Sequence, residues 1–181
     1  MKVIDTKLSE VKIIEYELKE TNRGYSYPLY DKFAIKRAGI EFENNFENVY
    51  DSLKAGTLYG IHFQNQPMGQ AKLLYCIEGE GIDYAIDLRK NSPTYLQWIS
   101  VEMSAKNRRQ IFIPSGFGHA FISLVDHTRN VMHFDIAFDS RYSRQLHYDE
   151  PRIGITYPFE HPILAPHDVN APYLDECDIN L

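Results

Sequence analysis

The amino-acid sequence predicts an all-β jelly-roll barrel with short peripheral helices, in a single domain that spans residues 1–181. Between about residues 57 and 138, short runs rich in Val, Ile, Leu, Tyr and Phe alternate with turn residues, as antiparallel strands do. Aromatic residues make up 13% of the chain, which suits strands better than helices. A chain of 181 residues is long enough for one sizeable core, and no linker or repeat marks a second domain.

The clearest predicted elements are two apolar runs, residues 72–77 and 82–88, joined by Glu-Gly-Glu-Gly as in a hairpin. Asn-Ser-Pro at residues 91–93 marks the next turn. Four further strands are expected at residues 96–103, 110–113, 120–125 and 131–138. This regular spacing is typical of a β-sandwich or barrel.

The two ends of the chain have different patterns. Residues 11–16 predict an early strand, and residues 39–52 predict a loop or a short helix. From Pro151 onward the sequence is interrupted by prolines. Neither end has the composition of a separate domain.

Charge and hydropathy exclude several classes of partner. The net charge is -6 and no long block of Lys and Arg is present, so nucleic acid is not expected as a partner. A small anionic ligand is compatible with the negative net charge, because one or two well-placed arginines are enough to bind phosphate. Since the sequence has no signal-peptide core and no stretch long enough to cross a membrane, it predicts a cytoplasmic protein without a membrane partner. The two cysteines, Cys76 and Cys177, are expected to be free thiols.

The first candidate for chemistry is His62, within the expected strand 58–64. Strand alternation places Gly60, His62 and Gln64 on one face, and Tyr59 and the other odd-numbered residues on the opposite face. If the first face lines the inside of a barrel, an imidazole and an amide project into a cavity suited to a small polar ligand.

A second histidine follows a proline-glycine turn, in the sequence PSGFGH that ends at His119. The spacing Pro-x-Gly-x-x-His also matches the second motif of metal-binding cupins, so a metal site has to be considered. Such a site needs a His-x-His pair and a carboxylate in the preceding motif, whereas His62 is followed by Phe63 and Gln64. The ligand set is incomplete, and no metal is predicted.

In order and spacing, several segments together resemble the dTDP-4-dehydrorhamnose 3,5-epimerase family, whose members act on nucleotide-linked 4-keto-6-deoxy sugars. The main matching segments are GIHFQ (60–64), QAKL (70–73), DLRKNSPTY (87–95), PSGFGHAF (114–121) and DEPRIGI (149–155). Two outlying segments also fit, NRGY (22–25) and PHDVNAP (166–172). The resemblance covers more than half of the chain and implies a cupin-like jelly roll.

The chemistry that the resemblance implies is removal of a proton from a carbon beside a ketone. His62 would be the general base, because a neutral imidazole titrates near the working pH. Asp168 would orient the imidazole ring and stabilise its charged form. Lys72 would stabilise the enolate that forms at the C4 oxygen, with help from His119.

The resemblance also implies contacts with the rest of the substrate. Arg23 is placed at the diphosphate, since a guanidinium matches phosphate oxygens. Gln64 and Phe138 are placed at the substrate-binding site. No redox cofactor or metal is required, because the ketone already acidifies the neighbouring carbon. The family further implies a homodimer in which N-terminal segments contribute to the neighbouring site, so Arg23 would act across that interface.

Three departures from the family pattern affect the expected outcome. Tyr59 stands where an arginine is usual, and residues 46–52 show no convincing match to the family's nucleotide-contacting stretch. Phe138 occupies the position of the tyrosine that acts as the acid, and phenylalanine cannot donate a proton. Asp139 is an alternative acid if burial raises its pKa, and Tyr142 is another if the loop is reshaped.

The sequence therefore predicts an epimerase of a nucleotide-diphosphate-linked 4-keto-6-deoxy sugar, in bacterial surface-carbohydrate or deoxysugar biosynthesis. Inversion at both C3 and C5 and inversion at C3 alone both remain open. A keto-isomerase acting on the same substrates is an alternative, because the same enolate serves both reactions. A jelly-roll protein that binds a sugar nucleotide without turnover is another.

Overall fold

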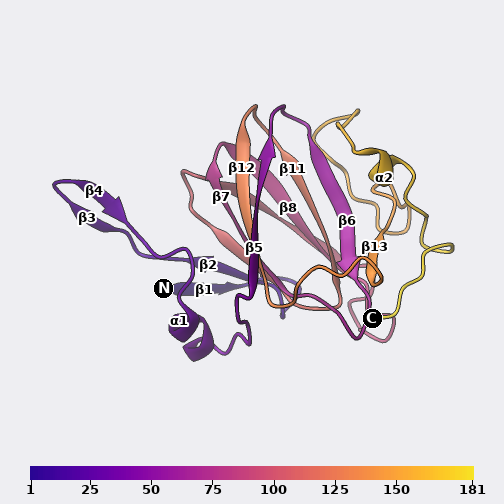
Figure 1. Ribbon diagram of the computed structural model, residues 1–181, viewed down its shortest axis with the longest axis horizontal. Helices are drawn as coiled ribbons and strands as arrows, with labels where there is room; N and C mark the ends of the chain where they lie inside the picture. Colours follow the sequence, from indigo (N-terminus) through magenta and orange to yellow (C-terminus); the bar gives the residue numbers. More distant parts are fainter.

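The computed structural model describes residues 1–181 and shows two antiparallel β-sheets that face each other (Figure 1). The larger sheet contains, in spatial order, β1 (Lys2–Asp5), β2 (Lys12–Glu15), β10 (Gln110–Ile113), β7 (Lys72–Glu78), β12 (Thr128–Phe134) and β5 (Phe46–Ser52). The smaller sheet contains β13 (Ser143–Gln145), β6 (Leu58–Gln64), β11 (Phe117–Ser123), β8 (Glu80–Asp87) and β9 (Trp98–Ser104). The remaining elements are the hairpin strands β3 (Lys19–Thr21) and β4 (Gly24–Ser26), and the short helices α1 (Lys32–Arg37) and α2 (Pro166–Val169). The predicted all-β jelly roll with short peripheral helices is confirmed.

Apolar side chains from both sheets fill the space between them. One buried cluster combines Leu74, Ile111 and Val131 of the larger sheet with Ala85 and Phe117 of the smaller one. Burying such side chains is the main favourable term in folding, at about 25 cal/mol per Å² of apolar surface. The shared cluster fixes the positions of the strands that carry the candidate site.

The C-terminal segment covers the outer face of the smaller sheet. Leu58 and Ile86 on that face pack in one cluster with Leu146, Ile155 and Ile179. In Figure 1 this segment runs beside β6 and carries α2 with it. Residues far apart in the sequence are therefore held together at one edge of the molecule.

The connection between β7 and β8 differs from the hairpin that the sequence predicted. Both strands form close to the expected residues, but β7 lies in the larger sheet and β8 in the smaller one. At Gly79, between them, φ is +72° and a Cβ would lie 2.6 Å from Oγ1 of Thr128. Glycine allows this left-handed turn and close approach. The chain thus crosses from one sheet to the other here, and the hairpin prediction is wrong.

The expectation of a loop or short helix over residues 39–52 is also wrong for its second half. Residues 46–52 form β5, an edge strand that pairs with β12, and the helix α1 lies earlier in the chain. Most β5 side chains are exposed, so the segment lacks the apolar run that marks a buried strand. The early strand predicted at residues 11–16 is confirmed as β2.

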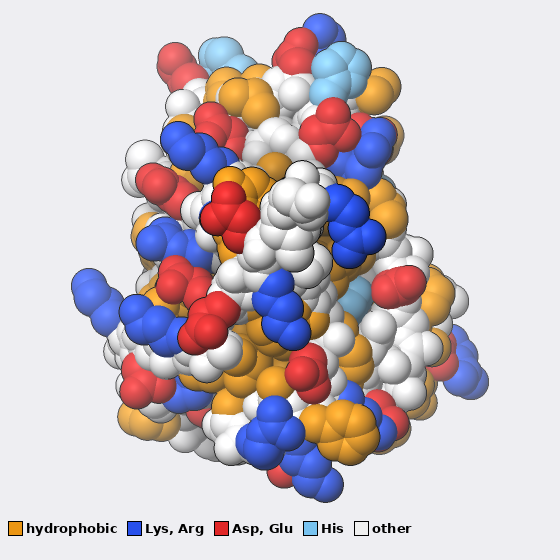
Figure 2. All heavy atoms as spheres, turned by 90° about the vertical axis from the view of Figure 1, so that its left-hand side faces the viewer, with side chains coloured by type: hydrophobic (Ala, Val, Ile, Leu, Met, Phe, Trp, Pro, Cys, Tyr) orange, Lys and Arg blue, Asp and Glu red, His pale blue; other side chains and the backbone are white.

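The hairpin β3–β4 projects away from the sheets, at the left of Figure 1. All residues of its two strands are exposed. Figure 2 views the molecule from this side and shows basic and acidic side chains mixed over the surface. No helix of the chain has the length and apolar character needed to cross a membrane.

Candidate active site

A pocket of about 560 Å³ opens between the two sheets. Its lining includes five residues that the sequence singled out: His62, Gln64, Lys72, His119 and Phe138. They come from β6, β7, β11 and the segment after β12, so residues from both sheets meet in one cavity. A concave site with a few convergent polar groups is the usual form of a small-molecule site.

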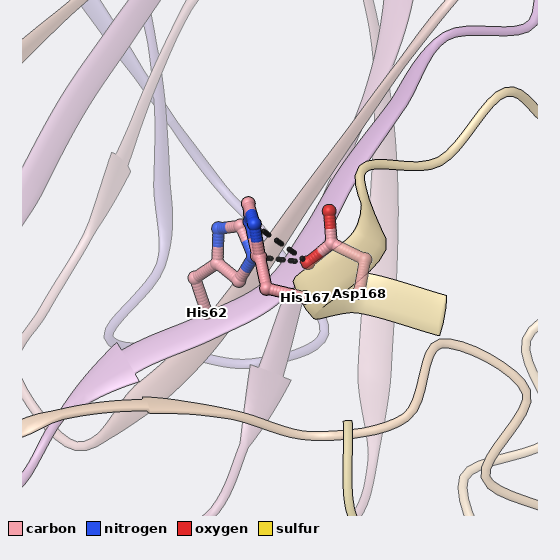
Figure 3. A group of neighbouring side chains, drawn as sticks. All are labelled: His62, His167 and Asp168. Atoms are coloured by element: carbon pink, nitrogen blue, oxygen red, sulfur yellow. Dashed lines mark hydrogen bonds and ion pairs between the residues drawn. The ribbon is translucent and has the colours of Figure 1, made fainter. Parts of the chain in front are cut away.

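His62 makes the most specific contact in the pocket. Its Nε2 lies 2.6 Å from Oδ1 of Asp168, which is the only strongly buried acidic residue of α2 (Figure 3). The Asp168 side chain is 2% exposed, whereas that of His62 is 31% exposed. The bond makes Nε2 the donor of a neutral imidazole, which leaves Nδ1 with a free lone pair. Asp168 can therefore orient the ring while Nδ1 remains able to accept a proton.

Lys72 is the buried cation of the pocket. The residue is 5% exposed, and its Nζ donates a hydrogen bond to the backbone oxygen of His62 at 3.2 Å. Burial lowers the pKa of Lys72 to about 8, although the nearby Asp83 carboxylate acts in the opposite direction. An ammonium group held in this position can stabilise negative charge that develops next to His62.

His119 lies on β11, opposite His62 in the register of the smaller sheet. Its Nε2 is 3.0 Å from Oδ1 of Asp83, and both side chains are almost completely buried. Burial lowers the pKa of His119 and raises that of Asp83, so desolvation favours the uncharged form of each group. His119 lines the pocket, whereas Asp83 is not among the lining residues.

The strand β6 contains an irregularity that changes which residues face the pocket. His119 pairs with His62, but Phe121 pairs with Tyr59, so β6 contains one more residue than β11 over this stretch. Gly60 lies inside it with φ +110°, and a Cβ there would clash with the backbone oxygen of His119. As a result Tyr59 lines the pocket together with His62. The expectation that Tyr59 faces the opposite side is wrong, because the bulge breaks the alternation.

Comparison with known proteins identifies the family. The model of the family dTDP-4-dehydrorhamnose 3,5-epimerase matches residues 5–176. The chain belongs to this family.

Its similarity to individual epimerases extends over nearly the whole chain. It is 34% identical to the dTDP-4-dehydrorhamnose 3,5-epimerase of Shigella flexneri, over 98% of each chain. The structure of the Legionella pneumophila 3,5-epimerase in complex with dTDP-4-keto-L-rhamnose has a TM-score of 0.92 and 32% identity, and covers 98% of this chain and 94% of its own. A 3'-monoepimerase from Streptomyces bikiniensis, in complex with dTDP-quinovose, has a TM-score of 0.87 and 30% identity, with 94% and 87% covered. Both single-site and double-site epimerases are therefore among its relatives, and the protein belongs to the isomerase class.

Phe138 lies at the rim of the epimerase pocket and is 63% exposed. Its neighbour Asp139 binds the Arg141 guanidinium, with one Nη2–Oδ2 distance of 2.6 Å. This contact lowers the pKa of Asp139 to about 2. The proposal that burial raises the pKa of Asp139 is wrong, since the carboxylate is ionised and has no proton to give. Neither Asp139 nor Tyr142 lines the pocket.

The amide of Gln64 is already engaged with the backbone. Its Nε2 donates to the oxygen of Met68 at 2.8 Å, and its Oε1 accepts from the N–H of Asp139 at 2.7 Å. Gln64 therefore holds the segment that carries Phe138. Arg23 lies on the exposed turn of the β3–β4 hairpin and does not line this pocket.

The sequence did not predict several residues that line the pocket. Phe46, Asn48 and Tyr50 line the pocket from β5, and their spacing of two is the signal that could have revealed a strand. The Tyr50 and Tyr59 rings pack edge to face with centroids 5.5 Å apart. Of this pair, Tyr59 is the residue that stands where the family pattern has an arginine, so an aromatic ring lines the pocket there.

His167 is another residue that the sequence did not predict, and it lies next to Asp168 in the chain. It lines the pocket, and its ring centroid is 5.7 Å from that of His62. His167 immediately precedes Asp168 in the segment PHDVNAP, and this adjacency was the available signal.

Proposed function

We propose that this protein is an epimerase of nucleotide-diphosphate-linked 4-keto-6-deoxy sugars, with His62 as the general base. The observation that carries the proposal is the hydrogen bond of 2.6 Å between His62 and the buried Asp168, at the wall of a pocket that also holds Lys72. Membership of the epimerase family supports the substrate class, because several relatives are named for dTDP-linked keto sugars.

In the proposed reaction, Nδ1 of His62 removes the proton from the carbon next to the C4 ketone. The electron pair of the broken C–H bond moves to the C4 oxygen, which gives an enolate, and His62 becomes a cation beside Asp168. The charged Lys72 stabilises the enolate oxygen. Return of a proton to the opposite face of the carbon completes the inversion. A positioned base of this kind contributes roughly 10²–10⁴-fold to the rate.

Inversion at C3 alone is the second candidate, and Phe138 is the observation that favours it. A phenyl ring has no proton to return, so the opposite face of the sugar would be protonated by water at this exposed rim. The single-site epimerase among the relatives shows that the fold supports such a reaction in that protein.

The diphosphate requires a cation in addition to Lys72, which the proposed reaction uses at the C4 oxygen. No arginine is among the residues that line the pocket, while Arg23 lies on a hairpin that projects from the body of the chain. We therefore propose a homodimer in which the hairpin of one protomer places Arg23 at the pocket of its partner. The proposed location is the cytoplasm, where nucleotide-linked sugars are made.

The experiment that tests this function is incubation with dTDP-4-keto-6-deoxyglucose and with matched sugars on other nucleotides, followed by NMR of the products. The expected result is formation of a C3 epimer, with or without inversion at C5. Binding of the sugar nucleotides without formation of any epimer would contradict the proposal.

A further inference from the structure

We propose that His62, His167 and Asp168 form a binding site for a zinc-like divalent cation, and that the cation blocks the base when it is bound. The ligand atoms of the three residues all lie within 4.8 Å of one another. In Figure 3 both imidazole rings and the carboxylate point toward a common centre. The inference concerns a property beyond epimerisation, since the proposed reaction needs no metal.

The distances are close to those of a tetrahedral site. Oδ1 of Asp168 lies 2.6 Å from Nε2 of His62 and 3.6 Å from Nε2 of His167. Zinc binds imidazole nitrogen and carboxylate oxygen at 2.0–2.2 Å, which places neighbouring tetrahedral ligands about 3.3 Å apart. One contact must therefore lengthen and the other must shorten slightly. The first change separates the His62 imidazole from the Asp168 carboxylate as the cation enters, and the second moves His167 toward Asp168.

His167 has the freedom to make the second of these changes. Its side chain is 57% exposed, whereas Asp168 is almost fully buried and already held against His62. Asp168 and His167 lie next to each other on α2, and His62 lies on β6, which α2 contacts. Two ligands are thus held next to each other in advance. They separate slightly as the cation enters, and the exposed imidazole of His167 moves toward them to complete the set.

The types of ligand atom favour zinc over magnesium and calcium. Two imidazole nitrogens and one carboxylate oxygen form a three-residue set of the kind found in open zinc sites, in which a fourth position holds water or another small ligand. Mg²⁺ and Ca²⁺ prefer sites made of oxygen atoms, and a single carboxylate does not provide one. Because His62 and His167 both line the pocket, the fourth position faces the cavity.

A cation at this site removes the base chemically. When Nε2 of His62 binds a metal, the ring proton must move to Nδ1, because a neutral imidazole carries only one N–H. Nδ1 is the atom that is free to accept a proton while Nε2 donates to Asp168. The bound cation therefore occupies the contact between His62 and Asp168 and blocks the accepting atom as well.

Metal binding can be tested without any activity measurement. Tag-free protein is titrated with ZnCl₂ by calorimetry and with Co²⁺ by visible absorption, for wild type, His167→Ala and His161→Ala. His161 is an exposed histidine that does not line the pocket, so its variant is the matched control. We expect one cation per wild-type chain, an intense tetrahedral Co²⁺ spectrum, and binding weakened about tenfold or more by His167→Ala but not by His161→Ala. Equal affinity in wild type and His167→Ala would overturn the proposal.

The same variants separate the metal site from the proposed function. Anomalous diffraction at the zinc edge from a Zn²⁺-soaked crystal should place the ion between the three side chains, and an ion bound elsewhere would contradict the site. In assays of proton exchange, Zn²⁺ should inhibit wild type and His161→Ala, with recovery on addition of EDTA. His167→Ala, normalised to its own rate without zinc, should need about tenfold more Zn²⁺ for the same inhibition. If the protein proves not to be an epimerase, the binding and diffraction results still decide whether the site exists.

Discussion

Oδ1 of Asp168 lies 2.6 Å from Nε2 of His62, although the two residues are 106 positions apart in the chain. His62 belongs to a central part of β6, and Asp168 to a one-turn helix in the C-terminal segment. The apolar cluster that holds this segment against the smaller sheet therefore also positions the carboxylate that orients the His62 ring. The geometry of the proposed base depends directly on the packing of the C-terminal segment.

Replacement of Asp168 by asparagine should slow proton exchange by roughly 10–100-fold, because an amide keeps the shape but cannot stabilise the charged imidazole. Thermal unfolding should show that the variant is folded. The exchange rate of the methine proton, followed by NMR, is the measurement. Asp149→Asn, at an exposed position, is the matched control. An exchange rate for Asp168→Asn equal to that of the control would show that the carboxylate has no part in the reaction.

The rate of proton exchange should fall as the pH rises through about 8, because Lys72, with its lowered pKa of about 8, loses its charge there. Below this pH the ammonium group is charged and stabilises the enolate, and above it the neutral amine cannot do so. Stability changes in the other direction. Since the folded protein loses a proton that the unfolded chain keeps up to a pKa of 10.5, the stability contribution of Lys72 rises between the two values.

A profile of exchange rate against pH, recorded together with circular dichroism, checks this prediction. Loss of rate with retained structure is the expected result. A rate that stays constant well above the pKa of about 8 would rule out a role for the charged form of Lys72.

Phe138→Tyr should change which carbons of the substrate exchange, because it places a phenol where the family has its proton donor. The side chain lies at the pocket rim and is 63% exposed, so the added hydroxyl should be tolerated without loss of stability. Positional deuterium analysis of the product is the measurement. Leu53→Tyr, at another exposed apolar position outside the pocket, should leave the pattern unchanged. If Phe138→Tyr also leaves it unchanged, the absence of tyrosine does not explain the specificity.

Gly60→Ala should destabilise the protein by roughly 2 kcal/mol or more, since the new Cβ combines a clash with the backbone of His119 and a φ of +110°. Gly39→Ala is the comparison, because its φ is +76° but nothing lies within 4 Å of the added carbon. Its cost should be about 1 kcal/mol. Urea denaturation of both variants measures the difference. Equal losses would mean that backbone strain alone, without the close approach, requires Gly60.

The sequence predicted the parts of the fold that depend on local pattern. The runs around Lys72 and His119 contain enough apolar and aromatic residues to be recognised as strands, and β7 and β11 form there. Lys72 and His119 also lie within segments that resemble the family, and both line the pocket. The contribution of Asp168 was expected only from the family resemblance, because nothing in the sequence pairs it with His62.

The errors concern features that long-range contacts decide. Gly79 turns the chain from one sheet to the other only because Thr128 packs against it, and no local pattern shows this. Tyr59 faces the pocket because β6 bulges against β11 at Gly60, which shifts the alternation by one residue. The β5 residues Asn48 and Tyr50 lie on an exposed edge strand, so they lack the hydrophobic signal on which strand prediction depends.

Deuterium uptake from D₂O into a nucleotide-linked 4-keto-6-deoxy sugar, compared between wild type and His62→Asn, tests directly whether His62 is the base. The asparagine variant keeps a polar side chain in the pocket but has no basic nitrogen at Nδ1. Wild type should incorporate deuterium next to the ketone, and His62→Asn should bind the sugar nucleotide with no detectable incorporation. Incorporation by His62→Asn at the wild-type rate would contradict the assignment of His62 as the base.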